Sequence, residues 1–332
     1  MKVAFFSTKP YDREFMDKAN QDNRHEFQYF DTRLDVSTAI LASEFDAVCI
    51  FVNDQADEET LQLLKDEGVK LVALRAAGFN NVDLQTAQSL GIKIARVPAY
   101  SPYAVAEHTL AMILTLNRKT HLAYERVRNG NFSLEKLMGF DLHGTTIGVV
   151  GTGKIGRIFA RNMHGLGCKV LAYDPYPNED FEREGTATYV SLEEMYPKVD
   201  ILSLHCPLND KTHHLVNKEA IDQMKDRVML INTSRGALVD TKAVIKALKH
   251  FKIGYFGIDV YEQEENLFFQ DLSGHIIQDD DISRLMTFPN VLITSHQAFF
   301  TENAMTNIAE TTLNNINQFE EGTELENEVK IE

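Results

Sequence analysis

The sequence is short of positive charge. It contains 33 Lys and Arg residues against 49 Asp and Glu residues, which gives a formal net charge of −16 at pH 7. A nucleic acid requires a basic surface that neutralises its phosphates, and an anionic membrane attracts a surface of the same kind. We therefore expect neither partner, and a small molecule is left as the expected ligand.

Cysteine is scarce as well, and no hydrophobic run is long. The three cysteines, Cys49, Cys168 and Cys206, show no paired spacing, which is typical of free thiols in a reducing compartment. The apolar run 110–116 is much shorter than the roughly 20 residues that span a bilayer, and residues 1–6 lack the apolar core of a secretory signal. These features predict a cytoplasmic protein.

What the chain does contain is an alternation of short apolar runs with longer helical patterns. Its 332 residues are enough for two domains. The alternation is typical of βαβ units, so we predict an α/β fold with two parallel-sheet domains. Strands are expected at 3–6, 47–52, 69–74 and 92–97, and then at 146–150, 169–173, 201–204, 228–231, 255–260 and 291–294.

Three further segments complete this pattern. One long helix is predicted over 101–128, with Ser101 as N-cap and Pro102 at the first helical position. A second helix is predicted over 301–319, followed by an acidic end, 320–332, that we expect to fray. Residues 261–288 have no clean period, and loops of that length are usually functional or disordered.

A glycine motif marks a dinucleotide site. Gly151, Gly153 and Gly156 form G-x-G-x-x-G between a predicted strand and a predicted helix. The three glycines allow a tight turn, close approach of a pyrophosphate, and close helix–strand packing, while the helix N-terminus attracts the anion. The next strand ends in Asp174, at the spacing expected for the acidic residue that binds the adenosine ribose.

Asp174 also indicates which dinucleotide binds. A carboxylate accepts hydrogen bonds from the ribose but repels a 2′-phosphate, and the following residues 175–178 include no Arg or Lys. NAD is therefore predicted rather than NADP. Because the motif begins at residue 151, a complete α/β unit precedes it, which differs from dehydrogenases that carry this motif near the N-terminus.

Three ionisable residues are expected at the carboxyl ends of strands, where α/β sheets carry their chemistry. They are Arg235, Glu264 and His296. Each alone could be an ordinary surface or core residue. Together they supply what reduction of a 2-keto acid requires: a planar donor for the carboxylate, a proton donor active near neutral pH, and a carboxylate that orients it.

Several motifs, in this order, resemble those of the D-isomer-specific 2-hydroxyacid dehydrogenases over essentially the whole chain. They are Arg75-Ala76-Ala77-Gly78-Phe79-Asn80-Asn81-Val82-Asp83, Ser101-Pro102-Tyr103-Ala104-Val105-Ala106-Glu107-His108, the glycine motif with Asp174, His205-Cys206-Pro207-Leu208, Asn232-Thr233-Ser234-Arg235-Gly236 and Ser295-His296-Gln297-Ala298. Gly257-Ile258-Asp259-Val260-Tyr261-Glu262, together with Tyr100 and Phe299, looks most like the D-lactate branch of that family.

The resemblance implies further roles. Substrate contacts are expected from Ala77, Gly78, Phe79, Tyr100 and Phe299, and NAD contacts from Ile155, Gly156, Cys206, Pro207, Thr212, Thr233 and Asp259. Thr212 stands where the D-lactate branch is expected to have Asn. The resemblance also implies a discontinuous substrate domain (1–100 and 299–332), an NAD-binding Rossmann domain (101–298) and a homodimer or dimer of dimers. We further expect a cleft between the two domains that closes over the cofactor about 98–101 and 296–300, because the two series of strands meet there.

Two other functions stay open on the sequence alone. One is a related dehydrogenase acting on a 2-hydroxyisocaproate, glycerate or glyoxylate type of substrate, although bulky Phe79, Tyr100 and Phe299 favour a small side chain such as that of pyruvate. The other is an NAD-sensing binding protein, which has less need of Arg235 and His296. No metal site is predicted, because His213-His214 has no ligand at metal-binding spacing and is expected to be a solvated pair.

Overall fold

A computed structural model describes residues 1–331, and it divides the chain into two compact units. The first unit comprises Met1–Ser101 together with Phe300–Glu332, and the second comprises Pro102–Phe299. Each unit is built on its own parallel sheet, which confirms the predicted α/β class.

The first unit has five parallel strands in the order β2-β1-β3-β4-β5, which is a flavodoxin-like order. The strands are β1 (Lys2–Phe5), β2 (Glu26–Tyr29), β3 (Ala47–Ile50), β4 (Leu71–Leu74) and β5 (Lys93–Ala95). Strands β3 and β4 are wholly buried, as expected of a parallel sheet covered on both faces. Strand β2 was not predicted.

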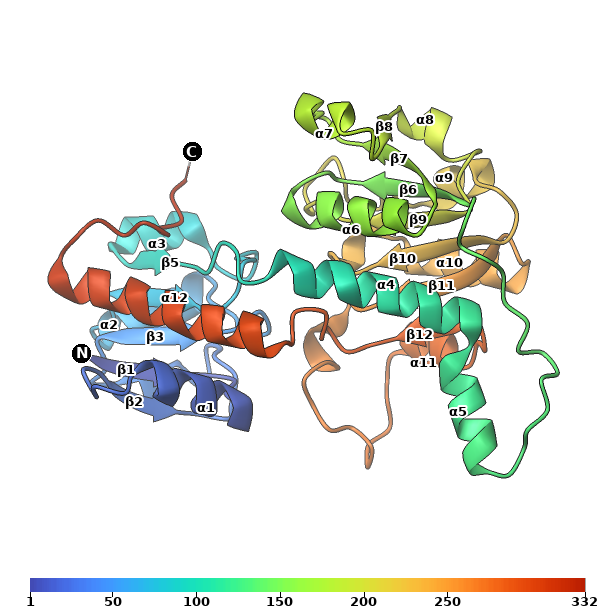
Figure 1. Cartoon of the computed structure of the whole chain (residues 1–332). Helices are drawn as coiled ribbons and strands as arrows, with labels where there is room; N and C mark the ends of the chain where they lie inside the picture. Colours follow the sequence, from blue (N-terminus) through green and yellow to red (C-terminus); the bar gives the residue numbers. More distant parts are fainter. Residues whose placement is uncertain (332) are drawn as a thin grey trace. The chain divides into compact units, whose positions relative to one another are not determined.

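Helices cover both faces of this sheet. They are α1 (Pro10–Ala19), α2 (Glu58–Asp66), α3 (Leu84–Leu90) and α12 (Glu302–Glu321), with a short 3₁₀ helix, η1 (Ala39–Ala42). Asp57 and Asp83 begin α2 and α3, because each side chain accepts a hydrogen bond from a backbone N–H of the first turn. Helix α12 packs against α1 and β4, so the end of the chain returns to the unit that contains its beginning (Figure 1).

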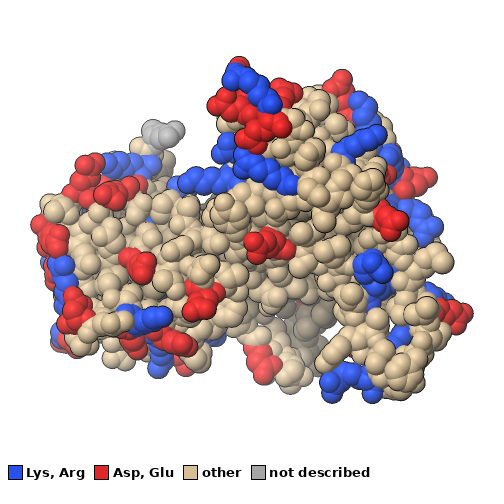
Figure 2. Space-filling model, in the orientation of Figure 1, with Lys and Arg blue, Asp and Glu red and all other residues tan. Residues whose placement is uncertain are grey.

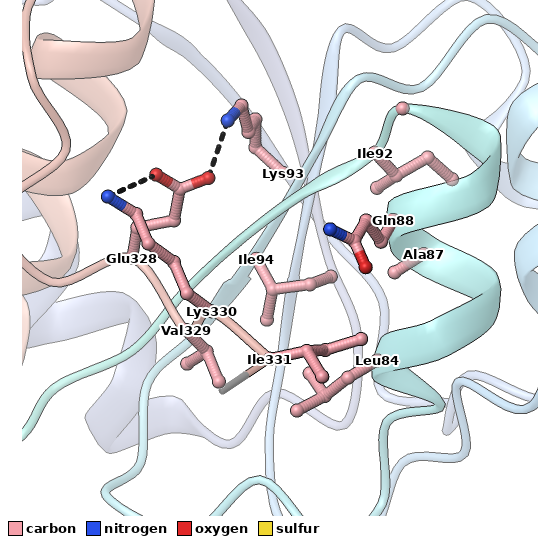
Figure 3. A pocket seen from close by; sticks show the side chains of 11 residues that line it. Leu84, Ala87, Gln88, Ile92, Lys93, Ile94, Glu328, Val329, Lys330 and Ile331 are labelled. Atoms are coloured by element: carbon pink, nitrogen blue, oxygen red, sulfur yellow. Dashed lines mark hydrogen bonds and ion pairs between the residues drawn. The ribbon is translucent and has the colours of Figure 1, made fainter.

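Up to Ile331 the acidic C-terminal segment is ordered by contacts with the first unit, although we predicted that 320–332 would fray, and residue 332 lies outside the described residues. Beyond α12 the chain forms an antiparallel bridge to β5 between Ala95 and Glu328, and the N–H of Val329 donates to Ile94 at 2.8 Å. Glu328 also lies between Lys93 and Lys330, with which it forms ion pairs of 2.6 and 3.6 Å (Figure 3). The backbone pairing and apolar contacts outweigh the acidic composition, and the segment lines a cavity of about 310 Å³ beside α3.

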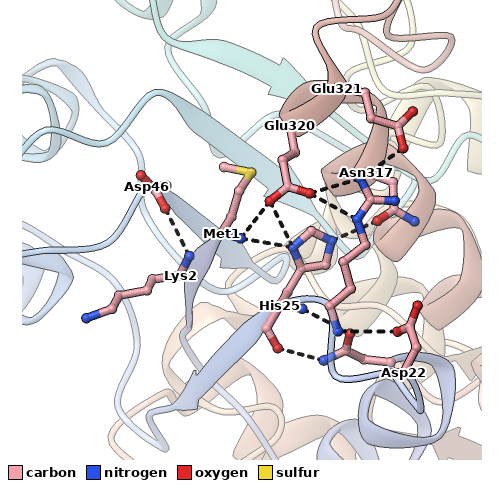
Figure 4. Close-up of polar contacts among 10 residues, drawn as sticks. Met1, Lys2, Asp22, His25, Asp46, Asn317, Glu320 and Glu321 are labelled. Carbon is pink, nitrogen blue, oxygen red and sulfur yellow. Dashed lines mark hydrogen bonds and ion pairs between the residues drawn. The ribbon is translucent and has the colours of Figure 1, made fainter.

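Polar contacts connect the beginning of the chain to α12, which lies near its other end. The amino group of Met1 lies 2.8 Å from a carboxylate oxygen of Glu320, and His25 Nε2 lies 2.7 Å from the side-chain oxygen of Asn317 (Figure 4). Arg24 forms ion pairs with Glu320 and Glu321. These contacts hold β1 and the start of β2 against the end of α12.

The second unit has seven parallel strands in the order β12-β11-β10-β9-β6-β7-β8. The strands are β6 (Thr146–Val150), β7 (Lys169–Tyr173), β8 (Thr188–Tyr189), β9 (Ile201–Leu204), β10 (Val228–Asn232), β11 (Ile253–Ile258) and β12 (Val291–Ile293). All except the two-residue β8 were predicted. The strand order reverses between β6 and β9, and a crevice outside such a reversal is where open α/β sheets bind ligands.

The remaining helices belong to this unit. They are α4 (Pro102–Arg118), α5 (Thr120–Arg128), α6 (Lys154–Gly165), α7 (Glu179–Arg183), α8 (Leu192–Met195), α9 (Lys218–Gln223), α10 (Thr241–Lys249) and α11 (Asp280–Met286), with 3₁₀ helices η2 (Gly236–Leu238) and η3 (Glu264–Asn266). The segment 261–288, for which no period was found, therefore contains two short helices. Asp279 begins α11 by accepting hydrogen bonds from two of its N–H groups.

The single helix predicted over 101–128 is in fact two helices. Lys119 adopts a left-handed conformation with φ of 51°, which ends α4 and redirects the chain into α5. Ile113 and Leu116 of α4 are buried in the core of the second unit, whereas α5 has no buried residue. The apolar run 110–116 therefore contributes Met112, Ile113 and Leu116 to the core, whereas Leu114 is exposed.

The surface of the described residues carries charges of both signs. On the face in Figure 2, acidic and basic side chains are scattered over the surface with other residues between them. Across residues 1–331 we find no helix with the length and apolar character needed to cross a bilayer. Cys49, Cys168 and Cys206 are all buried free thiols, as predicted.

Candidate active site

The glycine motif forms the turn between β6 and α6, and its three glycines have different surroundings. Gly151 has φ of +93°, and a Cβ there would lie 2.6 Å from the backbone N of Cys206. A Cβ on Gly156 would lie 1.9 Å from the carbonyl oxygen of Gly151. A Cβ on Gly153, by contrast, would meet nothing within 4 Å. Gly151 and Gly156 are therefore required by the packing of the protein's own backbone. Gly153 borders open space, which allows the close approach of a pyrophosphate.

A cavity of about 590 Å³ lies at this turn, outside the reversal between β6 and β9. Six of the predicted cofactor residues line it: Gly151, Gly153, Asp174, Cys206, Pro207 and Thr212. Its size falls in the range of small-molecule sites, and its lining is mainly apolar. The residues at this cavity therefore fit a dinucleotide.

Asp174 is held in place at the end of β7. One carboxylate oxygen accepts hydrogen bonds from the N–H and hydroxyl of Thr152, at 2.7 and 3.1 Å, and the other accepts from the N–H of Tyr176 at 2.9 Å. The carboxylate is thus fixed at the rim of the cavity by the glycine turn itself. This is the position that a ribose-binding carboxylate needs.

Four predicted cofactor residues do not line this cavity. Ile155 packs against the core, Thr233 is buried and hydrogen-bonded to Thr109 at 2.8 Å, and Gly156 supports the turn from within α6. Asp259 is fully buried after β11. Their contact with NAD remains a prediction.

Thr212 lines the cavity, but its hydroxyl is engaged in its own loop. It donates to the carbonyl of Pro207 at 2.7 Å and accepts from the N–H of Asn209 at 2.8 Å. The hydroxyl thus shapes the loop after β9. A direct bond from this hydroxyl to the cofactor would compete with those contacts.

His205 lies under the glycine turn, and sequence reasoning gave it no role of its own. Its Nε2 is 2.9 Å from the hydroxyl of Ser203, and its Nδ1 is buried without a hydrogen-bond partner among the described residues. Desolvation lowers the pKa of His205 to about 3, so the imidazole is neutral at ordinary pH. The turn therefore acquires no positive charge from this side chain.

The three predicted catalytic residues follow three neighbouring strands. Arg235 comes after β10, Glu264 after β11 and His296 after β12, and these strands are adjacent in the parallel sheet. The carboxyl ends of adjacent parallel strands lie at one edge of a sheet, so all three residues belong to the same edge of the second unit.

His296 and Glu264 form a direct pair. Nδ1 of His296 lies 2.7 Å from Oε1 of Glu264, and the other oxygen of Glu264 accepts from the N–H of Tyr261 at 2.8 Å. Both side chains are about one-fifth exposed. With Nδ1 engaged in this way, Nε2 is the nitrogen left for a substrate, which is the usual arrangement of an oriented acid–base histidine.

The backbone at His296 is unusual, and Asp259 holds it. His296 has φ of 53°, a region that non-glycine residues rarely adopt, and its N–H donates to the carbonyl of Asp259 at 2.7 Å. The Asp259 carboxylate accepts from the N–H groups of Gln297 and Ala298 and from the Thr294 hydroxyl. Asp259 therefore positions the loop of His296, a role that its place in a predicted strand did not reveal.

Arg235 is half-buried at the turn after β10. Asn232 donates from its side chain to the carbonyl of Arg235 at 2.8 Å, and the Ser234 hydroxyl donates to the carbonyl of Cys206 at 2.7 Å. These two neighbours in the Asn-Thr-Ser-Arg-Gly motif fix the turn and connect it to the loop that lines the cavity. Their side chains were not singled out from the sequence, although the motif contains both.

Gly236 brings the turn of Arg235 against the segment that leads to Glu264. A Cβ on Gly236 would lie 2.1 Å from the carbonyl carbon of Tyr261 and 2.3 Å from the N of Glu262. Both neighbours are backbone atoms, which cannot rotate away. Only glycine allows the two segments to approach this closely.

Gly236→Ala should therefore separate Arg235 from the pair formed by Glu264 and His296. A shift of about 1 Å in a catalytic group costs about 10²-fold in rate, so we expect kcat/KM to fall by about that factor while NADH still binds. Gly274→Ala is the matched control, because a Cβ at Gly274 meets nothing within 4 Å. Equal kcat/KM in Gly236→Ala and wild type would contradict this account.

The residues predicted to contact substrate are mostly in the first unit, in the loop after β4. Arg96 donates to the carbonyl of Ala77 at 2.8 Å, and its guanidinium lies 5.0 Å from the centre of the Phe79 ring. The carbonyl of Tyr100 accepts from Asn307 of α12 at 2.6 Å. Gly78 belongs to the same loop, and Phe299 is a buried residue of the second unit. Their contact with substrate remains a prediction.

The fold and the glycine turn define a dinucleotide-binding α/β protein, and the paired histidine adds the machinery of an oxidoreductase. Residues 110–298 match the family model described as D-isomer specific 2-hydroxyacid dehydrogenase, NAD binding domain. A 2-hydroxyacid dehydrogenase homolog of Haemophilus influenzae is 53% identical over 98% of each chain. The D-lactate dehydrogenase of Escherichia coli is 50% identical over 99% of this chain and 100% of its own.

Solved structures agree with these relatives. The apo-structure of D-lactate dehydrogenase from Escherichia coli matches with a TM-score of 0.91 and 48% identity, covering 99% of this chain and 100% of that one. The chain therefore belongs to the D-isomer-specific 2-hydroxyacid dehydrogenase family, whose members are NAD-dependent enzymes. The resemblance drawn from the sequence motifs is confirmed.

Proposed function

We propose that this enzyme is a D-lactate dehydrogenase, which reduces pyruvate to D-lactate with NADH and also catalyses the reverse reaction. The observation that carries this proposal is the pair of His296 and Glu264, with an Nδ1–Oε1 distance of 2.7 Å, at the sheet edge that also bears Arg235. The relatives named D-lactate dehydrogenase support the choice of substrate.

Each of these residues has a distinct task. NADH, when bound, supplies a hydride for C2 of the substrate. Arg235 binds the substrate carboxylate through two parallel hydrogen bonds, which a planar guanidinium can make. His296 donates a proton from Nε2 to the carbonyl oxygen as negative charge develops there, and Glu264 stabilises the protonated imidazole. In the oxidation of D-lactate the neutral His296 accepts that proton.

The size of the substrate is proposed from bulky side chains. Phe79, Tyr100 and Phe299 would leave room for a methyl group, as in pyruvate, and backbone N–H groups at Ala77 and Gly78 would help to bind the carboxylate. The test is NADH oxidation with a series of 2-keto acids, followed by chiral analysis of the product. Pyruvate should give the highest kcat/KM and the D-isomer. A preference for a branched keto acid or for glyoxylate, or an L-product, would contradict the proposal.

NAD is proposed over NADP because of Asp174. Asp174→Ala removes the carboxylate that would bind the ribose and repel a 2′-phosphate. A hydrogen bond to a charged group contributes about 1.5–3 kcal/mol, so we expect the KM for NADH to rise by about 10-fold or more and the preference over NADPH to shrink. Asp180→Ala, which changes an exposed residue of α7, is the control. An unchanged cofactor preference in Asp174→Ala would show that another feature selects NAD.

We also propose that the enzyme acts in the cytoplasm as a homodimer or dimer of dimers. The free, buried thiols of Cys49, Cys168 and Cys206 suit a reducing compartment. The oligomer rests on the family resemblance, and sedimentation equilibrium would determine the number of subunits.

A further inference from the structure

A second group of ligating side chains lies in the second unit, apart from the pair of His296 and Glu264. His213, His214 and Glu262 each offer a ligand atom, and these atoms all lie within 4.8 Å of one another. Nε2 of His214 is 2.6 Å from Oε1 of Glu262. The sequence predicted a solvated pair; His213 is indeed exposed, but His214 has a partner in Glu262, which lies 48 residues away in the sequence.

The fold brings these residues together from two segments. His213 and His214 follow the turn after β9, where the N–H of His213 donates to the carbonyl of Asn209 at 2.9 Å and that of His214 to Ala237 at 2.8 Å. Glu262 follows β11. The His214 backbone has φ of 49°, a conformation that is uncommon outside glycine and that persists only where neighbouring contacts enforce it.

The three side chains are oriented toward one another. The rings of His213 and His214 are stacked, with centroids 4.0 Å apart and an angle of 26° between their planes. The second oxygen of Glu262 accepts from the hydroxyl of Thr241 at 3.1 Å, and Thr241 is buried at the start of α10. A hydrogen bond of this kind behind a ligating carboxylate is what orients ligands in metal sites.

We propose that His213, His214 and Glu262 form a binding site for a divalent transition-metal ion such as Zn²⁺. Two imidazoles and one carboxylate are one of the three-residue ligand sets that bind Zn²⁺, with solvent as the fourth ligand of the tetrahedron. Mg²⁺ and Ca²⁺ are disfavoured because they prefer oxygen ligands. The ion takes the place of the direct contact between His214 and Glu262, whose Nε2 and Oε1 atoms lie 2.6 Å apart.

The ligand distances are compatible with a single ion. Bonds of about 2.0–2.2 Å to Zn²⁺ place its ligand atoms no more than roughly 4 Å apart. The His214–Glu262 contact must widen from 2.6 Å, and any separation near the 4.8 Å limit must shorten. The His213 ring is exposed and can rotate to meet this requirement.

The site would couple metal binding to the cofactor cavity. Thr212 and Leu215, on either side of the two histidines, line that cavity, and Glu262 lies two residues from Glu264. An ion held by both segments would restrain one side of the cavity. We expect NADH to dissociate several-fold more slowly when the site is filled.

The first test is calorimetric titration of the full chain with Zn²⁺, after treatment with a chelator and without NADH or keto acid. Wild type should show one saturable site. His213→Ala should weaken it by at least about tenfold, which corresponds to about 1.4 kcal/mol. His275→Ala, which removes an exposed histidine elsewhere, should bind as wild type does. Equal affinity in His213→Ala and wild type, or no saturable binding in wild type, would overturn the proposal.

A second variant separates this site from the catalytic pair. His296→Ala should retain the full Zn²⁺ affinity, because His296 is not a ligand. Loss of binding in His296→Ala would place the ion at Glu264 instead and would overturn the proposal. Since no turnover is measured, the result is independent of whether pyruvate is the substrate.

The coupling is tested by stopped-flow measurement of NADH release. Release should be several-fold slower with Zn²⁺ than with chelator in wild type, and equal under both conditions in His213→Ala. Equal rates in wild type would overturn the proposed coupling. The visible absorption of bound Co²⁺ gives a further readout, because tetrahedral coordination by imidazole should produce intense bands that are absent in His213→Ala.

Discussion

His296→Ala should reduce the turnover number for pyruvate by about 10²–10⁴-fold, the usual contribution of a positioned acid or base. The loss should fall on kcat, because the proton is donated in the transition state. His296 does not line the dinucleotide cavity, so NADH affinity should stay near that of wild type. Steady-state kinetics and an NADH fluorescence titration check both parts.

His275→Ala is the control, since that histidine is exposed. Wild-type turnover in His296→Ala would remove this residue from the mechanism. Glu264→Gln gives an independent measurement. It replaces the carboxylate oxygen that lies 2.7 Å from Nδ1 of His296, so kcat for pyruvate should fall while NADH affinity stays near that of wild type. An unchanged kcat would assign the orienting role elsewhere.

Arg235→Lys should lower kcat/KM for pyruvate by about 10²-fold while preserving the positive charge. An ammonium group cannot form the two parallel hydrogen bonds that a guanidinium makes with a carboxylate, and hydrogen bonds to charged groups contribute about 1.5–3 kcal/mol each. The KM for pyruvate should rise and kcat should fall, because the substrate is both bound and oriented by this contact. Steady-state kinetics with varied pyruvate separates the two effects.

The matched control is Arg183→Lys, whose guanidinium forms only exposed ion pairs on α7. Its kinetics should equal those of wild type, since exposed pairs contribute little. If Arg235→Lys also showed wild-type constants, the substrate carboxylate would have to bind at another residue, and the assignment of this edge of the sheet as the active site would fail.

Most of the strands were predictable because parallel, doubly covered strands are continuous apolar runs. The missed strands lack that signal. Strand β2, Glu26–Tyr29, lies at the edge of its sheet and is only partly buried, so Glu26 and Gln28 interrupt its apolar pattern. Strand β8 has two residues. Local pattern is weakest where the tertiary structure leaves a strand exposed or very short.

The other errors arise from contacts that are distant in the sequence. The break at Lys119 falls within an uninterrupted helical pattern, and it accompanies a contact of its ammonium group with the ring of Tyr255 at 5.5 Å. The order of the C-terminal segment depends on pairing with β5. The residue types at Lys119 and in the C-terminal segment do not indicate these partners, so a local sequence pattern could not predict either contact.

The candidate site was predictable for a different reason. Gly151, Asp174, Arg235 and His296 each follow a predicted strand, and sheet topology then brings the ends of neighbouring strands together. The supporting residues were not found, because their function depends on geometry rather than on residue type. Asp259 positions the His296 loop through its carboxylate, and Gly236 acts only through the absence of a side chain.

The discontinuity of the first unit has a consequence for how the protein is made. During synthesis the second unit has all its strands once residue 299 has emerged. The first unit is completed later, when α12 packs against α1 and the segment at Glu328 pairs with β5. Until then the apolar faces of residues 1–101 that α12 covers stay open to solvent. A nascent chain stalled before residue 300 therefore presents a folded second unit next to an incomplete first one, which is the kind of surface that chaperones bind and proteases cleave.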